Sequence, residues 1–179
     1  MKWTLDTTHS AAEFAVKHLM ISTVKGHFKT FTGNGETNAD GTLKSAELTI
    51  DASSISTNVE ARDNHLMSPD FLDVAQFPTI TFRSTKIEQQ GTDITITGAL
   101  TMHGETKPVT LKGELTGAVK DPWGNQRTAL AVSGKINRKE WGLGWNQVLE
   151  AGGIAVGEEV KLSVEFEAVA VKDEALVAA

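Results

Sequence analysis

Residues 94–119 read ITITGALTMHGETKPVTLKGELTGAV and contain two runs in which apolar and polar side chains alternate. In the first run, from 94 to 102, isoleucine, leucine and methionine recur at alternate positions, with threonine or alanine between them. The second run, from 109 to 119, repeats the pattern with valine, leucine and glycine, and His103-Gly104 lies between the two runs. Alternation with a period of two is typical of a strand with one buried face. A short glycine-containing connection joins antiparallel neighbours, so this stretch predicts a β-hairpin.

The same period recurs along most of the chain. Each further run presents one apolar and one polar face, and turn signals separate several of the runs. The connections are too short for helical crossovers, which indicates antiparallel pairing throughout. In total the pattern predicts about eight strands. The further runs lie near residues 12–18, 23–31, 47–52, 79–83, 130–136 and 160–167. The turn signals are Asn34-Gly35, Asp40-Gly41, Gln90-Gly91 and Gly124-Asn125.

Eight strands with a continuous apolar face must bury that face, either in a sandwich or in a closed barrel. Glycines at 98, 113, 117 and 134 fall on the apolar rows, which favours a barrel because strongly coiled strands place glycine where the pleat bends. Missing side chains on the inner rows would also leave room for a cavity, since a barrel of this size holds packed side chains or one small ligand. The alternative is that these glycines mark bulges in a filled barrel, which would then serve as an interaction module.

Two segments depart from the strand pattern. A short helix is expected at about residues 58–67, capped by Ser56, Thr57 or Asn58 and stopped by Ser68-Pro69. An irregular loop rich in tryptophan and glycine is expected at residues 140–153. The chain has the length of one domain, which we place at residues 1–172, followed by a frayed tail at 173–179.

Composition excludes several classes of function. The formal net charge of -6, with no basic block, argues against a nucleic-acid partner. The absence of cysteine excludes disulfides, thiolate metal sites and cysteine nucleophiles. The chain opens with MKWTLDTTHSAAEF, which has no apolar signal segment, and no apolar run is long enough to span a membrane. The expected compartment is therefore the cytoplasm, or the periplasm if the start is processed.

The histidines do not form a recognisable catalytic or metal-binding motif. The five histidines show neither an H-x-H nor an H-E-x-x-H spacing, and the chain has no G-x-S-x-G segment around a nucleophilic serine. We therefore expect no catalytic residue, no metal and no cofactor. A small-barrel enzyme acting on an apolar substrate, with His65 or His103 as general base, stays open as the alternative function.

Five segments in order carry a resemblance to a known family: DTTHSAAEFAVKHL, SISTNVEARDNHLMSPDFLDVAQFPTITFRS, GALTMHGETKPVTL, INRKEWGLGWN and VGEEVKLSVEFEA. Over residues 2 to 171 the chain resembles the YceI-like family. Members of that family form a lipocalin-like antiparallel barrel and bind polyisoprenoid lipids in an apolar tunnel. The resemblance thus implies an all-β, eight-stranded lipocalin-like barrel that carries or sequesters an isoprenoid lipid or an isoprenoid quinone as its ligand. Whether the barrel forms a homodimer is left open.

Candidate ligand-binding residues follow from the inward rows and from the segment after the helix. Arg62 has two interpretations: a structural anchor for the helix, which we favour, or a contact to a lipid headgroup, since a guanidinium suits phosphate. His65 and Leu66 are placed at the tunnel mouth, Phe71 in a plug that forms the last wall, and His18 at the end of the first apolar row. The residues expected to point inward are Phe14, Val16, Phe28, Phe82, Ile96, Leu100, Met102, Val132, Val164 and Phe166.

Overall fold

The structure is a computed structural model that describes residues 1–172; the predicted frayed tail, residues 173–179, lies outside the described residues. Strands dominate, and a single α-helix, α1 (Glu60–Met67), occurs within the described part. Two 3-10 turns, η1 (Ala52–Ser54) and η2 (Arg138–Trp141), complete the elements. The strands are β1 (Lys2–His18), β2 (Ser22–Phe28), β3 (Phe31–Thr37), β4 (Leu43–Asp51), β5 (Ile55–Ser56), β6 (Thr79–Gln90), β7 (Asp93–Met102), β8 (Glu105–Lys120), β9 (Gln126–Asn137) and β10 (Val156–Ala170).

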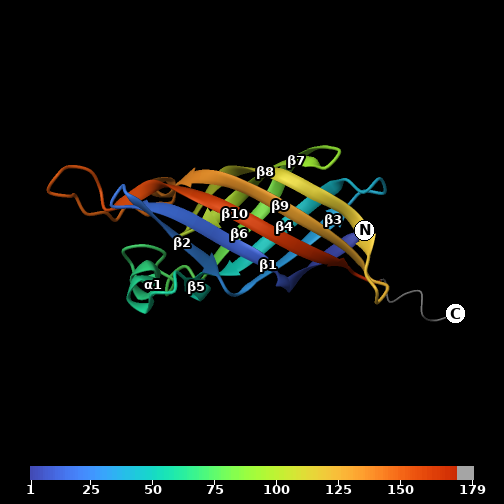
Figure 1. Cartoon of the computed structure of the whole chain (residues 1–179), viewed down its shortest axis with the longest axis horizontal. Helices are drawn as coiled ribbons and strands as arrows, with labels where there is room; N and C mark the ends of the chain where they lie inside the picture. The colour runs from blue at the N-terminus through green and yellow to red at the C-terminus, as the bar shows by residue number, and fades with distance from the viewer. Residues whose placement is uncertain (173–179) are drawn as a thin grey trace.

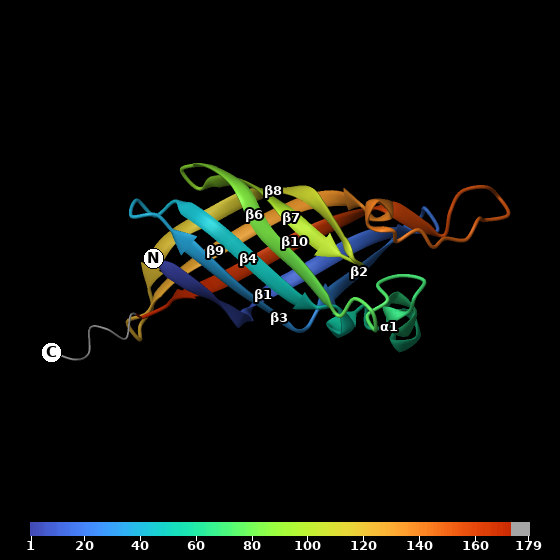
Figure 2. The ribbon, with the colours of Figure 1, turned by 180° about the vertical axis from the view of Figure 1, so that it is seen from behind.

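Eight of these strands close into an antiparallel barrel, as the sequence predicted. They follow one another in the order β10, β9, β8, β7, β6, β4, β3 and β1, and β1 pairs with β10 to complete the ring. Figures 1 and 2 show the barrel from its two long sides, with strands inclined to the long axis. Closure removes unpaired sheet edges from the ring and encloses the inner side-chain rows.

The first strand is longer than the sequence pattern indicated. Its pairing with β10 shifts register between Asp6 and Ala11, where five steps along β1 match two along β10. This bulge interrupts the period of two, so only the part from Ala12 onward alternates visibly. The N-terminal part of β1 pairs with β3 and the C-terminal part pairs with β2.

Residues 23–31, expected as one strand, comprise all of β2 after Ser22, a break at Lys29-Thr30 and the first residue of β3. Asn34-Gly35, expected as a turn, lies inside β3 opposite β4, so that prediction was wrong. Neither residue has a positive φ, which a tight hairpin turn of the asparagine-glycine type requires. The other turn signals fall between strands as predicted, with Gln90 as the last residue of β6.

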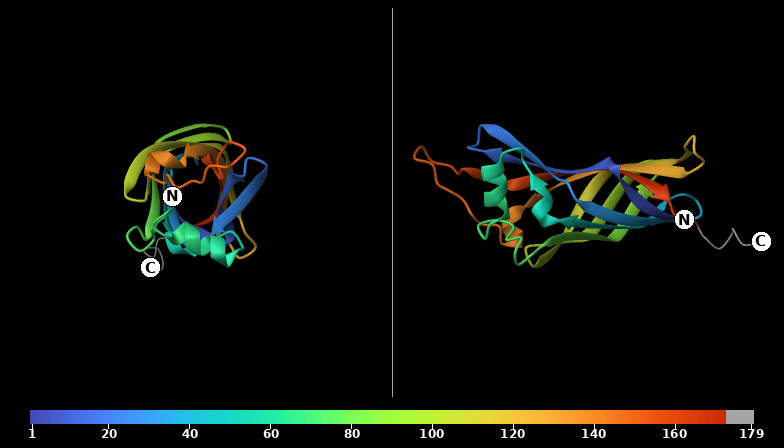
Figure 3. Two further views of the ribbon diagram at one scale, coloured as in Figure 1. Left: turned by 90° about the vertical axis from the view of Figure 1, so that its left-hand side faces the viewer. Right: turned by 90° about the horizontal axis from the view of Figure 1, so that it is seen from below.

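The helix α1 lies beside one end of the barrel, and Figure 3 shows it next to the ring viewed end-on. It begins after Val59, whose side chain makes no capping hydrogen bond, so the expected cap at Ser56, Thr57 or Asn58 is not formed. Instead Asp63 accepts hydrogen bonds from the backbone and hydroxyl of Thr57, at 2.7 and 2.6 Å. The N-terminus lies at the opposite end of the barrel (Figure 1).

The interior holds the apolar core. Ile96 and Trp141 are the largest side chains that are almost fully buried, and they come from β7 and η2. The indole of Trp141 donates a hydrogen bond to the carbonyl of Leu100 at 3.1 Å, which joins η2 to β7. In residues 1–172 no helix has the length and apolar character needed to cross a bilayer.

Candidate functional site

A long, apolar cavity occupies the barrel interior. Its volume is about 270 Å³, near the lower end of the range for small-molecule pockets. Its walls nevertheless extend along β10 from Val156 to Ala168, and a strand of that length, tilted as in small barrels, spans roughly 30 Å of the barrel axis. A small volume spread over that length means a narrow tunnel. Its shape suits one extended chain rather than a compact molecule.

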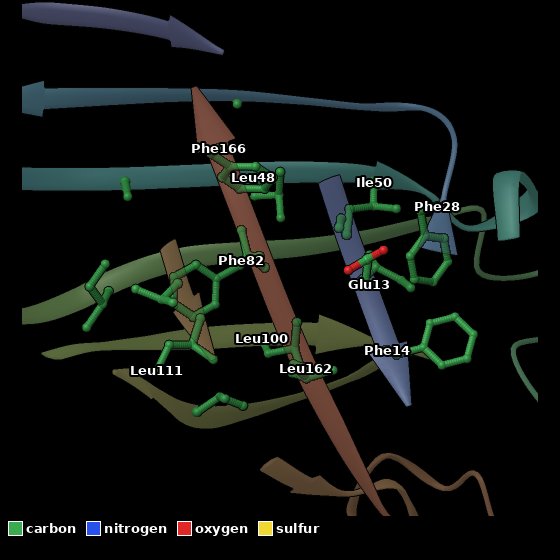
Figure 4. A pocket seen from close by; sticks show the side chains of 18 of the residues that line it. Glu13, Phe14, Phe28, Leu48, Ile50, Phe82, Leu100, Leu111, Leu162 and Phe166 are labelled. Atoms are coloured by element: carbon green, nitrogen blue, oxygen red, sulfur yellow. The ribbon is translucent and has the colours of Figure 1, made fainter. Parts of the chain in front are cut away.

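All ten residues predicted to point inward lie in the wall of this cavity. They come from six strands, and Figure 4 shows several of them converging on the same space. Alternation assigned each of these side chains to the inner face of its strand. A register error of one residue would have turned the whole row of that strand outward. The ten are Phe14, Val16, Phe28, Phe82, Ile96, Leu100, Met102, Val132, Val164 and Phe166.

None of the glycines at 98, 113, 117 and 134, which were expected to leave room for the cavity, lines it, so that expectation was wrong. A Cβ atom on Gly98 would lie 2.6 Å from Cε2 of Phe82, and one on Gly26 would lie 2.6 Å from Cε1 of Phe14. A Cβ atom on Gly134 would lie 2.7 Å from the carbonyl oxygen of Thr110. These glycines therefore give room to phenyl rings and to closely approaching strands, and the cavity is the space that the larger side chains leave.

The segment after α1 covers the helix end of the cavity. Phe71 and Leu72 are buried, and both line the cavity together with the half-buried Leu66, as expected for Leu66 and Phe71. His65 lies one layer further out, with 39% of its side chain exposed. Its ring packs edge-on against Phe71 and Trp145, with centroid distances of 5.1 and 4.7 Å, and its Nε2 is 2.8 Å from Asp70 Oδ2.

Three residues of the candidate set lie away from the cavity wall: His18, Arg62 and His65. His18 is exposed at the end of β1, because a register shift between Val16 and His18 ends the inward row. Arg62 is half-buried and donates hydrogen bonds to the Thr57 hydroxyl at 2.7 Å and to the Thr57 carbonyl at 3.1 Å. These contacts match the anchor interpretation of Arg62.

Arg138 is a cavity residue that the sequence interpretation missed. It follows Ile136 on β9 by two positions, so it continues the inward row of that strand. Its side chain is buried, and its guanidinium donates to the carbonyls of Gly157, Leu143 and Val156. The continued alternation was the available signal, although charged residues are seldom buried.

At the end of the barrel opposite α1, Arg127 forms ion pairs with three carboxylates. Its guanidinium contacts Asp6 at 2.9 Å, Asp121 at 2.8 Å and also Glu167, linking β9 to β1, β10 and the β8–β9 turn. Hydrogen bonds from Thr8 and Arg127 lower the pKa of Asp6, and the bond from Arg127 lowers the pKa of Asp121. Asp6, His9 and Glu167 could in principle hold a metal ion, but the Arg127 guanidinium supplies the positive charge there.

A closed eight-stranded barrel around a narrow apolar tunnel defines a class of small-molecule-binding barrels. Within that class the chain belongs to the YceI-like family, because residues 3–168 match the profile of the YceI-like domain. A UPF0312 protein of Staphylococcus aureus is 43% identical over 168 residues, which span 92% of this chain and 95% of that protein.

Solved structures show the same fold. The Campylobacter jejuni YceI protein superposes with a TM-score of 0.74 at 28% identity, covering 87% of this chain and 90% of that one. Burkholderia cenocepacia BcnA gives a TM-score of 0.76 at 21% identity, covering 91% and 98%. A polyisoprenoid binding domain from Saccharophagus degradans gives 0.66 at 16% identity, covering 94% and 98%. At these identities the two latter proteins bear on the fold alone.

Proposed function

We propose that the protein binds one isoprenoid chain, of a lipid or a quinone, inside its barrel and thereby sequesters or carries it. The observation that carries this proposal is the apolar tunnel that extends along the length of β10. A domain with the same fold, from Saccharophagus degradans, is described as polyisoprenoid binding, which makes such a chain the first ligand to test.

The energetics of an apolar ligand support the proposal. Each methylene group transferred from water to an apolar wall contributes about 0.8 kcal/mol. Ordering a ligand on association costs about 4–15 kcal/mol, which a long hydrocarbon chain offsets without any polar contact. A dry, narrow tunnel is therefore sufficient for binding, and it selects for length and width of the chain.

The alternative, catalysis on an apolar substrate, finds less support in the described residues. Neither His65 nor His103 lines the cavity, and Nδ1 of His103 is 2.9 Å from the carbonyl oxygen of Trp141. A general base must come within hydrogen-bond reach of the proton that it removes. Both rings make contacts within the protein instead, so we propose binding rather than turnover.

The proposal is tested by incubating the purified protein with a long-chain prenol and analysing the extract by mass spectrometry. We expect the prenol to co-elute with the protein in gel filtration and to be recovered chemically intact after prolonged incubation. Conversion of the prenol to a product that depends on the protein would favour the enzyme alternative. No co-elution would contradict lipid binding.

A further inference from the structure

An apolar tip protrudes at the end of the barrel where α1 lies. The tip is the turn of the β1–β2 hairpin, in which Leu19, Met20 and Ile21 are 38%, 65% and 83% exposed. Figures 1 and 2 show this turn next to the start of β10. The loop before β10 holds the turn in place, because the Leu19 N–H donates to the carbonyl of Ala155 at 2.8 Å and the sulfur of Met20 lies over Gly153.

The turn has apolar side chains at two positions that favour other residue types. Leu19 and Met20 have φ values of 51° and 60°, and the Ile21 N–H donates to the carbonyl of His18 at 3.2 Å. A two-residue hairpin turn with positive φ at both central positions is usually built from asparagine and glycine, because other side chains are strained there. Neither this strain nor the exposure stabilises the barrel, which indicates a contact outside the chain for the apolar tip.

Positive charges flank the apolar tip. Between Glu13 and Glu36 the chain has no acidic residue, and it carries the exposed lysines Lys17, Lys25 and Lys29. Within residues 1–172 these lysines form no ion pair. The register of the hairpin places Lys17 and Lys25 at diagonal positions on one face. This local positive charge contrasts with the formal net charge of -6 for the whole chain.

Apolar side chains on a projecting turn, with lysines behind them, suit the surface of an anionic bilayer. The side chains enter the boundary between headgroups and acyl chains, and the lysines bind the anionic headgroups. A stable protein interface buries roughly 800 Å² on each partner, far more than a turn of three apolar residues provides. In the neighbouring loop, residues 141–157 have Glu150 as their one charge, and Val148 there is 79% exposed.

We propose that the β1–β2 turn docks the protein on an anionic lipid bilayer. Met20 and Ile21 enter the acyl boundary, Lys17 and Lys25 contact the headgroups, and the loop with Val148 lies along the surface. Docking places the α1 end of the barrel against the bilayer, which is the phase in which long isoprenoid chains dissolve. This membrane contact goes beyond binding inside the barrel and does not depend on it.

Co-sedimentation with vesicles of phosphatidylglycerol and phosphatidylcholine, with no isoprenoid present, tests the docking. We expect the wild type to bind these vesicles, to bind phosphatidylcholine alone at least about tenfold more weakly, and to dissociate as salt is raised. A wild type that stays in the supernatant with the anionic vesicles at low salt would overturn the inference. Because the vesicles contain no isoprenoid, this failure would leave the proposed function standing, and a failure to bind prenol would leave the docking standing.

Variants of the turn test the apolar contact. Leu19→Asn combined with Met20→Gly gives the turn its favoured residues, so this double variant should melt at a higher temperature than the wild type while its vesicle affinity falls at least about tenfold. Trp123→Ser removes an 80% exposed side chain from the β8–β9 turn at the opposite end and should bind as the wild type does. Undiminished vesicle binding by the double variant would overturn the inference.

Variants of the lysines test the contact with the headgroups. Each lysine near an anionic surface strengthens binding about fivefold, so Lys17→Gln combined with Lys25→Gln should weaken binding about twentyfold at low salt. Lys44→Gln combined with Lys112→Gln changes the net charge equally at exposed positions on β4 and β8, and it should bind as the wild type does. Equal losses in the two double variants would overturn the assignment of the hairpin as the docking surface.

Discussion

The ring of Phe82 on β6 lies over Gly98 on β7, so closely that a Cβ atom on Gly98 would come within 2.6 Å of the ring carbon Cε2 and of the Arg83 carbonyl oxygen. Phe82 fills the space that a side chain at 98 would otherwise occupy. This pairing fixes the position of one aromatic wall of the tunnel, because the outer end of the Phe82 ring occupies the space where a Cβ on Gly98 would lie.

We therefore expect Gly98→Ala to force Phe82 out of its position and to destabilise the barrel by about 1–3 kcal/mol, the usual cost of overpacking. Chemical denaturation measures the change. Gly117→Ala is the matched control, because no atom lies within 4 Å of a Cβ at that position. If Gly98→Ala and Gly117→Ala unfold at the same denaturant concentration, the contact does not constrain the barrel.

Filling the tunnel should block binding without unfolding the protein. Leu162 lines the cavity, and replacing it with tryptophan places a large ring in the tunnel, whereas the adjacent Ser163 does not line the cavity. We expect Leu162→Trp to lose prenol binding and to retain its melting temperature, and Ser163→Trp to bind normally. Equal binding by both variants, measured by co-elution, would show that the ligand does not occupy the tunnel at β10.

Arg62 is expected to act on stability and not on ligand choice. Its two hydrogen bonds to Thr57 tether α1 to the segment that precedes it, and Arg62→Ala should cost about 1–2 kcal/mol of stability in the ligand-free protein. The preference between a prenyl phosphate and the matching prenol should stay as in the wild type. A selective loss of phosphate binding at an unchanged melting temperature would instead identify Arg62 as a headgroup contact.

The Arg127 cluster should make the far end of the barrel sensitive to acid. The folded-state pKa values of Asp6 and Asp121 are lowered, so their ionised forms stabilise the fold above the usual aspartate pKa of 3.8, and this stabilisation is lost as pH falls through the lowered values. Arg127→Met should lower the melting temperature at neutral pH. The gap to the wild type should close as the pH falls below 3.8.

Melting curves of the wild type and Arg127→Met between neutral pH and strong acid check this expectation. Lys135→Met is a suitable control, because Lys135 forms an exposed pair with Glu159 that is expected to contribute little. A gap between wild type and Arg127→Met that stays constant into strong acid would contradict the assigned role of the carboxylates.

The inner rows were predictable from the sequence because alternation alone assigns each side chain to one face of its strand. The same rule failed at His18, where a register shift ends the row, and a bulge cannot be seen in the residue types around it. The rule also extends to Arg138, two positions after Ile136, although charged residues are seldom buried.

The helix end of the barrel was less predictable. The packing of His65 between Phe71 and Trp145 joins segments about 80 residues apart in the chain, and it depends on how the loop before β10 folds back. No local pattern encodes that path. The sequence allowed the anchor role of Arg62 to be predicted, but not its partner. Thr57 was expected to cap the helix, and it instead accepts a hydrogen bond from the Arg62 guanidinium.

Native mass spectrometry of the protein, purified without detergent and supplied with a long-chain isoprenoid, tests the central claim most directly. A tunnel of this width predicts a complex of one protein with one intact lipid chain, and predicts its loss in Leu162→Trp. A wild-type spectrum that shows only ligand-free protein, or a lipid that remains bound in Leu162→Trp, would contradict the account.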